Sequence, residues 1–218
     1  MEPPEATRKR ARLVLRRLKR RYPEMGTALA YHSAWELLVS TIISAQTTDE
    51  NVNSVTPTLF ERWPDAAALA GARLEEVEQV IFSTGFYRQK TKSIVTMSAD
   101  LMERFGGEVP ADLESLITLR GVGRKTASVV LAEVWGKPAI AVDTHVKRLS
   151  GRLGLTEKTD ATKIEFDLRA LYDRRQWAGI SMRFIQFGRD VCNARKPLCF
   201  ECPLNEICPY PDKTPVPE

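Results

Sequence analysis

The stretch Leu119-Arg-Gly-Val-Gly-Arg-Lys-Thr-Ala127 decides how the rest of the chain is interpreted. Its two glycines, Gly121 and Gly123, stand two residues apart between short apolar runs. Glycine adopts positive φ angles without steric penalty and lets a ligand come close to the backbone. The residues from Thr126 to Trp135 follow with helical apolar spacing, so the motif predicts a tight turn that leads into a helix. The free N–H groups at such a helix start suit a phosphate, although an ordinary turn between two helices has the same pattern.

The other segments of the chain also show helical periodicity, and none has the alternation of a convincing strand. The segment from Ser33 to Ala45 is apolar nearly all round, which is typical of a buried central helix. Pro57 lies inside a helical pattern and predicts a kink or a break there. The fold class that we predict is therefore all-α. The expected helices cover residues 8–22, 33–45, 50–62, 65–70, 74–81, 88–105, 126–135, 145–153, 160–171 and 177–191, with one more short helix after Asp112.

The charge of the chain is compatible with nucleic acid as a partner without requiring it. The 218 residues carry a net charge of +4, and Arg8 to Tyr22 alone holds nine lysines and arginines on an amphipathic helical pattern. Those cations form either a solvated face or a stripe that faces DNA. No apolar run approaches the roughly 20 residues of a membrane helix, and the N-terminus has no apolar signal segment. We expect a cytoplasmic protein, associated with the nucleoid if bacterial.

All four cysteines fall near the end of the chain, at Cys192, Cys199, Cys202 and Cys208. Disulfides are disfavoured in a reducing cytosol, so four thiols within one short segment indicate a metal site. The spacing C-x6-C-x2-C-x5-C contains only one of the two C-x-x-C pairs that structural zinc usually shows. Four thiolates also suit an iron–sulfur cluster, and the spacing alone does not choose between the two.

Four separate pieces of the chain together resemble the endonuclease III family of helix-hairpin-helix DNA glycosylases. The resemblance covers nearly the whole chain, and the cysteine spacing is its most specific part. It implies that the cysteines hold a [4Fe–4S] cluster. Arg120 departs from the family, which usually has proline there, so we expect a looser turn entry and an additional phosphate contact. The four pieces are Ser44-Ala-Gln46 followed by Thr-Thr-Asp49, the stretch Leu119–Ala127, Val142-Asp-Thr-His145, and the cysteine segment.

The same resemblance implies two helical domains around a cleft. Residues 27–137 would form a six-helix barrel that holds the hairpin at 119–125. Residues 1–26 and 138–218 would form an iron–sulfur domain with its cluster loop at 192–208. Lys125 would come from the first domain and Asp143 from the second, and the two would meet across the cleft. We expect the protein to be a monomer.

The resemblance also assigns catalytic roles that the residues alone would not suggest. Asp143 by itself predicts only a helix cap, but a carboxylate can stabilise the positive charge that develops on the sugar when a base leaves. A neutral Lys125 amine can attack C1′ and form a Schiff base, after which β-elimination cuts the strand on the 3′ side. The implied partner is duplex DNA with a damaged base, such as an oxidised pyrimidine, or an abasic site.

The damaged nucleotide must leave the base stack to be reached, and its place must be filled. By resemblance Gln46 is the filler, where the sequence alone indicates only a solvated loop glutamine. His145 by itself predicts a packed histidine. The residues that we expect at the DNA are Gln46, Arg120, Gly121, Val122, Gly123, Arg124, Thr126, His145, Arg195 and Lys196.

Three other functions remain open at this point. An adenine mismatch glycosylase shares the cluster, but that family lacks the lysine at position 125 and has a glutamate near the end of the buried helix. A thymine mismatch glycosylase usually lacks the lysine as well. A non-catalytic DNA-binding module would use the hairpin for phosphate and the cysteines for structural zinc.

Overall fold

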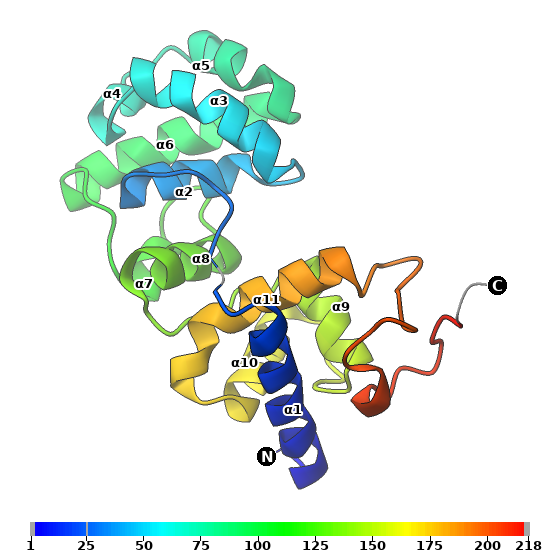
Figure 1. Ribbon diagram of the computed structural model, residues 1–218. Helices are drawn as coiled ribbons and strands as arrows, with labels where there is room; N and C mark the ends of the chain where they lie inside the picture. Colours follow the sequence, from blue (N-terminus) through cyan, green and yellow to red (C-terminus); the bar gives the residue numbers. More distant parts are fainter. Residues whose placement is uncertain (1–2, 25, 216–218) are drawn as a thin grey trace. The chain divides into compact units, whose positions relative to one another are not determined.

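A computed structural model describes residues 3–24 and 26–215, so the ends of the predicted ranges 1–26 and 138–218 lie partly outside it. The described residues are helical with no strand, which confirms the predicted fold class (Figure 1). None of their helices has the length and apolar character needed to span a membrane. The chain divides into two compact units. We call Thr27–Lys137 the hairpin unit, and Met1–Gly26 with Pro138–Glu218 the cysteine unit.

The hairpin unit is organised around α2 (Ala34–Ile43), in which every residue from Leu37 to Ile43 is buried. This confirms the predicted central helix. Ser33 accepts a hydrogen bond from the N–H of Glu36, and the Glu36 carboxylate accepts one from His32, so the helix start is capped from both sides. Around α2 pack α3 (Asp49–Arg62), α6 (Tyr87–Phe105) and α8 (Arg124–Trp135), and the unit also holds α4 (Ala66–Ala70), α5 (Leu74–Ile81), η1 (Phe82–Thr84) and α7 (Leu113–Leu116).

The expected break at Pro57 does not occur, because α3 is one helix from Asp49 to Arg62. Thr48 caps its start by accepting a hydrogen bond from the N–H of Asn51. Proline removes one backbone hydrogen bond, but the apolar side chains of Val52, Val55 and Leu59 are buried. Packing of this face, rather than local propensity, therefore holds the helix together.

The cysteine unit consists of α1 (Glu5–Arg21), α9 (Thr144–Arg152), α10 (Ala161–Leu171), η2 (Arg174–Gln176), α11 (Trp177–Asp190) and η3 (Asn205–Ile207). Its core is built on α11, whose Phe184 and Phe187 are fully buried and whose neighbours include α9 and α1. The buried Arg183 donates hydrogen bonds to the carbonyls of Tyr22 and Pro23, which fixes the chain as it leaves α1. This core holds the start of α9 and the cysteine segment on one scaffold.

Candidate active site and cysteine cavity

Glycine occupies the two hairpin positions, 121 and 123, for different structural reasons. Gly121 has φ +78°, and a Cβ added there would lie 2.9 Å from the Cβ of Ser93 on α6. The fold itself therefore requires glycine at this position. Gly123 has an ordinary extended backbone, and no atom lies within 4 Å of the Cβ that would be added. Nothing in the described protein demands glycine there, so the backbone of Gly123 faces space that an external ligand can enter closely.

The turn entry is anchored to α6 by hydrogen bonds. The N–H of Arg120 donates to Oδ2 of Asp100 at 2.9 Å, and the guanidinium of Arg104 donates to the hydroxyl of Thr118 at 2.7 Å. Proline at position 120 could not donate the first of these bonds. Arginine at position 120 therefore replaces the rigid proline ring of the family pattern with a hydrogen bond to Asp100. This bond holds the entry to the turn in place. The Arg120 side chain is exposed.

Helix α8 starts at Arg124, two residues earlier than the spacing predicts, with Gly123 as its N-cap. No side chain caps this end. The N–H groups of Lys125 and Thr126 lie in the first turn, where helix geometry offers no intrahelical acceptor, and the helix dipole is positive there. The Lys125 side chain is exposed. The hairpin thus presents backbone donors and an exposed amine at one helix end, a combination that suits a phosphate and a nearby electrophile.

Two exposed loop tips of the hairpin unit have strained backbones. Gln46, between α2 and α3, has φ 55°, and Phe86, the N-cap of α6, has φ 47°. They are the non-glycine residues with positive φ in the described chain. Such conformations cost on the order of 1–3 kcal/mol each and persist where the surroundings impose them, often at functional sites. Phe86 is also 66 % exposed, which is unusual for an aromatic side chain.

Asn51 on α3 joins these two loops. Its side-chain amide donates to the hydroxyl of Thr47 at 3.2 Å and to the carbonyl of Ser83 at 2.9 Å, and the Ser83 hydroxyl donates back to Asn51 at 3.0 Å. The amine of the buried Lys90, on α6, also holds this loop by donating to the carbonyl of Thr84 at 2.8 Å. Burial lowers the pKa of this lysine. Neither Asn51 nor Phe86 was among the residues predicted from the sequence. The only signal for them was the turn at Gly85-Phe-Tyr87, which does not reveal an exposed, strained tip.

In the cysteine unit, Asp143 caps α9 as predicted, since its Oδ1 accepts a hydrogen bond from the N–H of Val146 at 2.8 Å. His145 is half-buried, and desolvation lowers its pKa. Its Nδ1 lies 3.1 Å from the guanidinium of Arg148. Gly188 of α11 permits the packing, since an added Cβ would lie 2.7 Å from Nδ1 of His145.

Two arginines of α9 connect the Asp143 helix to the first cysteine. The Arg148 guanidinium donates to the carbonyl of Cys192 at 3.1 and 3.2 Å and to that of Gly188 at 3.0 Å. Arg152 donates to Sγ of Cys192 at 3.3 Å and to the carbonyl of Asn193 at 2.7 Å. Neither arginine was among the residues predicted from the sequence. Their four-residue spacing, which places them on one face of a helix, was the signal that could have revealed them.

All four cysteines line one cavity, together with apolar side chains such as Leu149, Phe187 and Leu198. Burial raises the pKa of Cys202 to about 11 and also raises that of Cys208. Within residues 3–24 and 26–215, no three histidine, cysteine or acidic side chains converge on a single point as ligands of one ion would. Arg195 and Lys196 are exposed on the loop between the first two cysteines.

The structure thus gathers Asp143, His145 and the cysteine segment within one unit, and the hairpin and the Gln46 loop within the other. Lys125 and Asp143 belong to different units, so their pairing stays a prediction.

Comparison with known proteins shows the family of the chain. The family model described as HhH-GPD superfamily base excision DNA repair protein matches residues 39–174, and the chain belongs to this family. Within it, the chain is similar to endonuclease III of Synechocystis, at 52 % identity with 93 % of each chain covered, and to endonuclease III of Bacillus subtilis, at 43 % identity with 86 % of each covered. A solved structure described as a trapped endonuclease III–DNA covalent intermediate superposes with a TM-score of 0.90 at 39 % identity, covering 93 % of this chain and 96 % of that one.

Proposed function

We propose that the protein is a bifunctional DNA glycosylase and abasic-site lyase of base excision repair, acting as a monomer on damaged duplex DNA. The observation that carries this proposal is the similarity to endonuclease III, one relative of which has been trapped as a covalent DNA intermediate. Trapping of such an intermediate requires a nucleophile on the protein. Lys125, an exposed amine in the first turn of α8, has the chemistry for that role. Because the similar proteins come from bacteria, we propose that this protein acts on the chromosome in the cytoplasm.

In the mechanism that we propose, the bond from C1′ to the base nitrogen breaks while the Lys125 nitrogen bonds to C1′. The Asp143 carboxylate stabilises the positive charge on the sugar during this step. Ring opening yields a Schiff base, which acidifies the C2′ hydrogens. Loss of one of these protons expels the 3′ phosphate and cuts the strand. The resemblance favours oxidised or saturated pyrimidines as the bases removed.

The hairpin and the two strained tips would hold the DNA for this chemistry. The open space at Gly123 and the uncapped α8 terminus favour a phosphate at the hairpin, with Arg120, Gly121, Val122, Arg124 and Thr126 around it. Gln46 would fill the gap left by the flipped nucleotide. The exposed Phe86, tied to the Gln46 loop through Asn51, supports a second wedge between bases of the same duplex.

The cysteine cavity fits a [4Fe–4S] cluster. A cluster of four irons takes one thiolate at each iron, so its ligands surround a volume, whereas zinc needs four ligands at about 2.3 Å from one point. Cys192, Cys199, Cys202 and Cys208 would hold it, and bound there it would supply a rigid structural centre for the loop. Arg195 and Lys196 on that loop would contact the DNA backbone. His145 would contact the DNA near Asp143. We expect Cys199→Ser to give protein without visible absorbance and with a lower melting temperature.

Borohydride trapping tests the catalytic proposal. Wild-type protein should form a covalent complex with duplexes that carry either thymine glycol or an abasic site. Lys125→Arg is the matched variant, because arginine keeps the positive charge but is not deprotonated and cannot form a Schiff base. It should bind the abasic duplex and trap nothing.

Trapping by Lys125→Arg would refute the assigned nucleophile. Base release without trapping by the wild type would favour a monofunctional mismatch glycosylase. Neither base release nor trapping would favour a non-catalytic binding module.

A further inference from the structure

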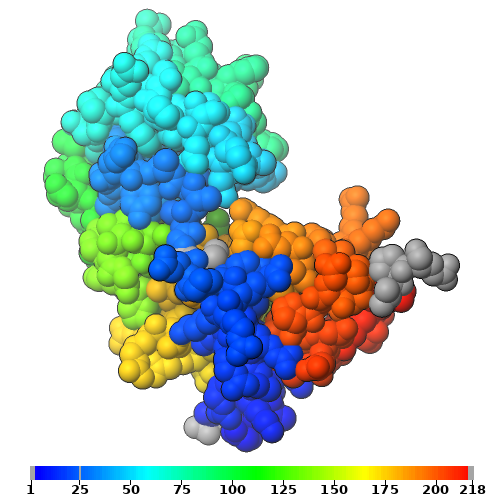
Figure 2. All heavy atoms as spheres, viewed as in Figure 1, coloured from blue at the N-terminus to red at the C-terminus, as the bar shows by residue number. Residues whose placement is uncertain are grey.

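The N-terminal helix forms one wall of a groove that carries a row of cations. Arg8, Arg12, Arg16 and Lys19 of α1 line it opposite Tyr172 and Gln176. Residues three and four apart share a helix face, so these four cations form one stripe. The core face of α1 is a different one. Figure 2 shows α1 (blue) exposed between α10 (yellow) and the cysteine segment (orange), all within the cysteine unit. We call this surface the α1 groove.

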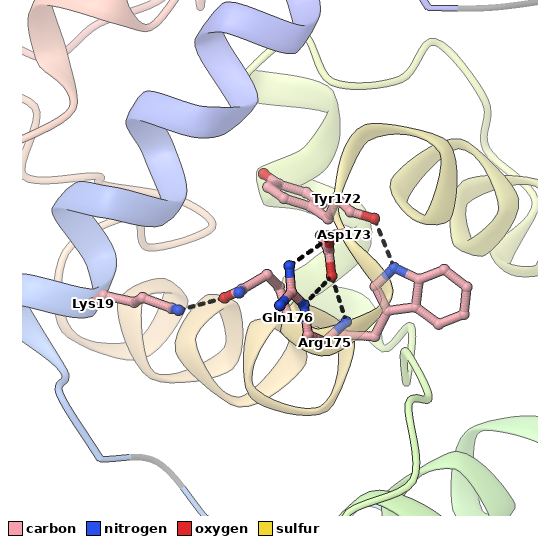
Figure 3. A network of polar contacts seen from close by, with 6 residues as sticks. Lys19, Tyr172, Asp173, Arg175 and Gln176 are labelled. Atoms are coloured by element: carbon pink, nitrogen blue, oxygen red, sulfur yellow. Dashed lines mark hydrogen bonds and ion pairs between the residues drawn. The ribbon is translucent and has the colours of Figure 1, made fainter.

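Three cations of the α1 groove, Arg12, Arg16 and Lys19, are exposed to solvent, while Arg8 donates a hydrogen bond to the carbonyl of Pro3 at 3.1 Å. Arg12 pairs with Glu5 at 2.7 Å in an exposed position. Lys19 donates to the side-chain oxygen of Gln176, which carries no charge (Figure 3). Asp173, the carboxylate that lines the groove, forms an ion pair with Arg175 at 3.0 Å. Like charges on one helix face repel each other, so the stripe has a cost in the free protein that a bound anion would remove.

Tyr172 forms the floor of the α1 groove and belongs to the core beneath it, where it packs in one cluster with Ala11, Val14 and Leu18 of α1. Its backbone carbonyl accepts a hydrogen bond from the indole N–H of Trp177 at 2.9 Å, which fixes this wall of the groove (Figure 3).

We propose that the α1 groove binds the phosphodiester backbone of a nucleic acid, as a contact separate from the hairpin. From Arg8 to Lys19 the stripe extends roughly 16 Å at 1.5 Å per residue, and a DNA strand advances 3.4 Å per nucleotide. The stripe therefore matches a run of about five nucleotides and is too long for one isolated anion. The lining groups are donors and cations, which contact phosphate without reading sequence.

A competition-free binding assay on the full-length holoprotein tests this proposal. The catalytic site is first saturated with a short duplex that carries a stable abasic-site analogue. Fluorescently labelled oligothymidine is then added, and its anisotropy is followed over a range of salt concentrations. The test variant is Arg16→Ala/Lys19→Ala. The matched control is Lys158→Ala/Lys163→Ala, which removes two exposed cations of the same unit outside the groove.

We expect the wild type and the control to bind the oligothymidine and the test variant to bind it about tenfold more weakly. Its log–log salt slope should fall by about 1.4, since each lost phosphate contact on a single strand lowers the slope by about 0.7. Equal losses in both variants would indicate general charge attraction and overturn the proposal. So would the absence of a second binding event on the wild type. Tighter binding of an oligoglutamate of equal charge would assign the groove to an acidic protein segment instead.

Discussion

Alanine substitution of the two hairpin glycines should separate the needs of the fold from those of the ligand. Gly121→Ala places a side chain at φ +78° and 2.9 Å from the Cβ of Ser93. Gly123→Ala adds a methyl group to an extended backbone with no atom within 4 Å. The first change should destabilise the protein, and the second should not. Both should weaken DNA binding, because both glycines lie where we expect the phosphate.

The magnitudes follow from the local geometry. A left-handed conformation costs an alanine roughly 1–2 kcal/mol. Forcing the overlap with α6 apart adds about 1 kcal/mol, at the lower end of overpacking costs. The free energy of unfolding should therefore fall by about 2–3 kcal/mol, which lowers the melting temperature by roughly 4–12 °C for a chain of this size. For Gly123→Ala, the poorer cap and the reduced entropy of the unfolded chain oppose each other, so the change should stay within about 0.5 kcal/mol.

Thermal unfolding followed by circular dichroism measures the stability, and fluorescence anisotropy with an abasic-analogue duplex measures the affinity. Repeating Gly121→Ala in a Ser93→Gly background removes the contact and keeps the backbone strain, so part of the loss should return. Wild-type stability of Gly121→Ala would refute the reasoning about the turn. Wild-type affinity of Gly123→Ala would show that the open space beside Gly123 is not where DNA approaches.

Further predictions concern the residues around this hairpin and the Asp143 helix. Asp143→Asn should keep the α9 cap, since asparagine caps as well as aspartate, yet slow base release at least tenfold in single-turnover assays; equal rates would leave Asp143 as a cap only. Asn51→Ala should free both strained tips and weaken binding to duplexes with a flipped-out nucleotide more than binding to intact duplex, and equal weakening would argue against a role in insertion. Gly188→Ala should cost about 1–3 kcal/mol in urea unfolding, because its methyl group displaces His145, and an unchanged midpoint would contradict the close packing. Since the folded pKa of His145 lies below its unfolded value near 6.5, its contribution to stability is present above that pH and is lost as pH falls below it. His145→Gln should flatten the pH dependence of the unfolding free energy in this window, and an unaltered slope would exclude His145 as its source.

The sequence by itself determined the features that depend on neighbours along the chain. Helical periodicity identified an all-α fold, because the side chains that cover one helix face recur every three to four residues. The N-caps at Ser33, Asp65, Asp112 and Asp143 were predictable for the same reason, since each bonds an N–H only three residues away. The cysteine segment was equally visible, as its four cysteines are close in sequence. Even so, α8 begins two residues before its apolar pattern does, because polar residues occupy its first turn.

Only the tertiary structure decided which distant residues hold these local features in place. It showed that Gly121 is required by Ser93, that Asn51 connects the loop of Gln46 to Ser83, and that Arg152 bonds Cys192 forty positions away. Such contacts leave no periodicity, since one donor and one acceptor can meet from any separation in the chain. The sequence specifies each helix through repeated short-range spacing, whereas the packing of helices determines which single side chains become neighbours.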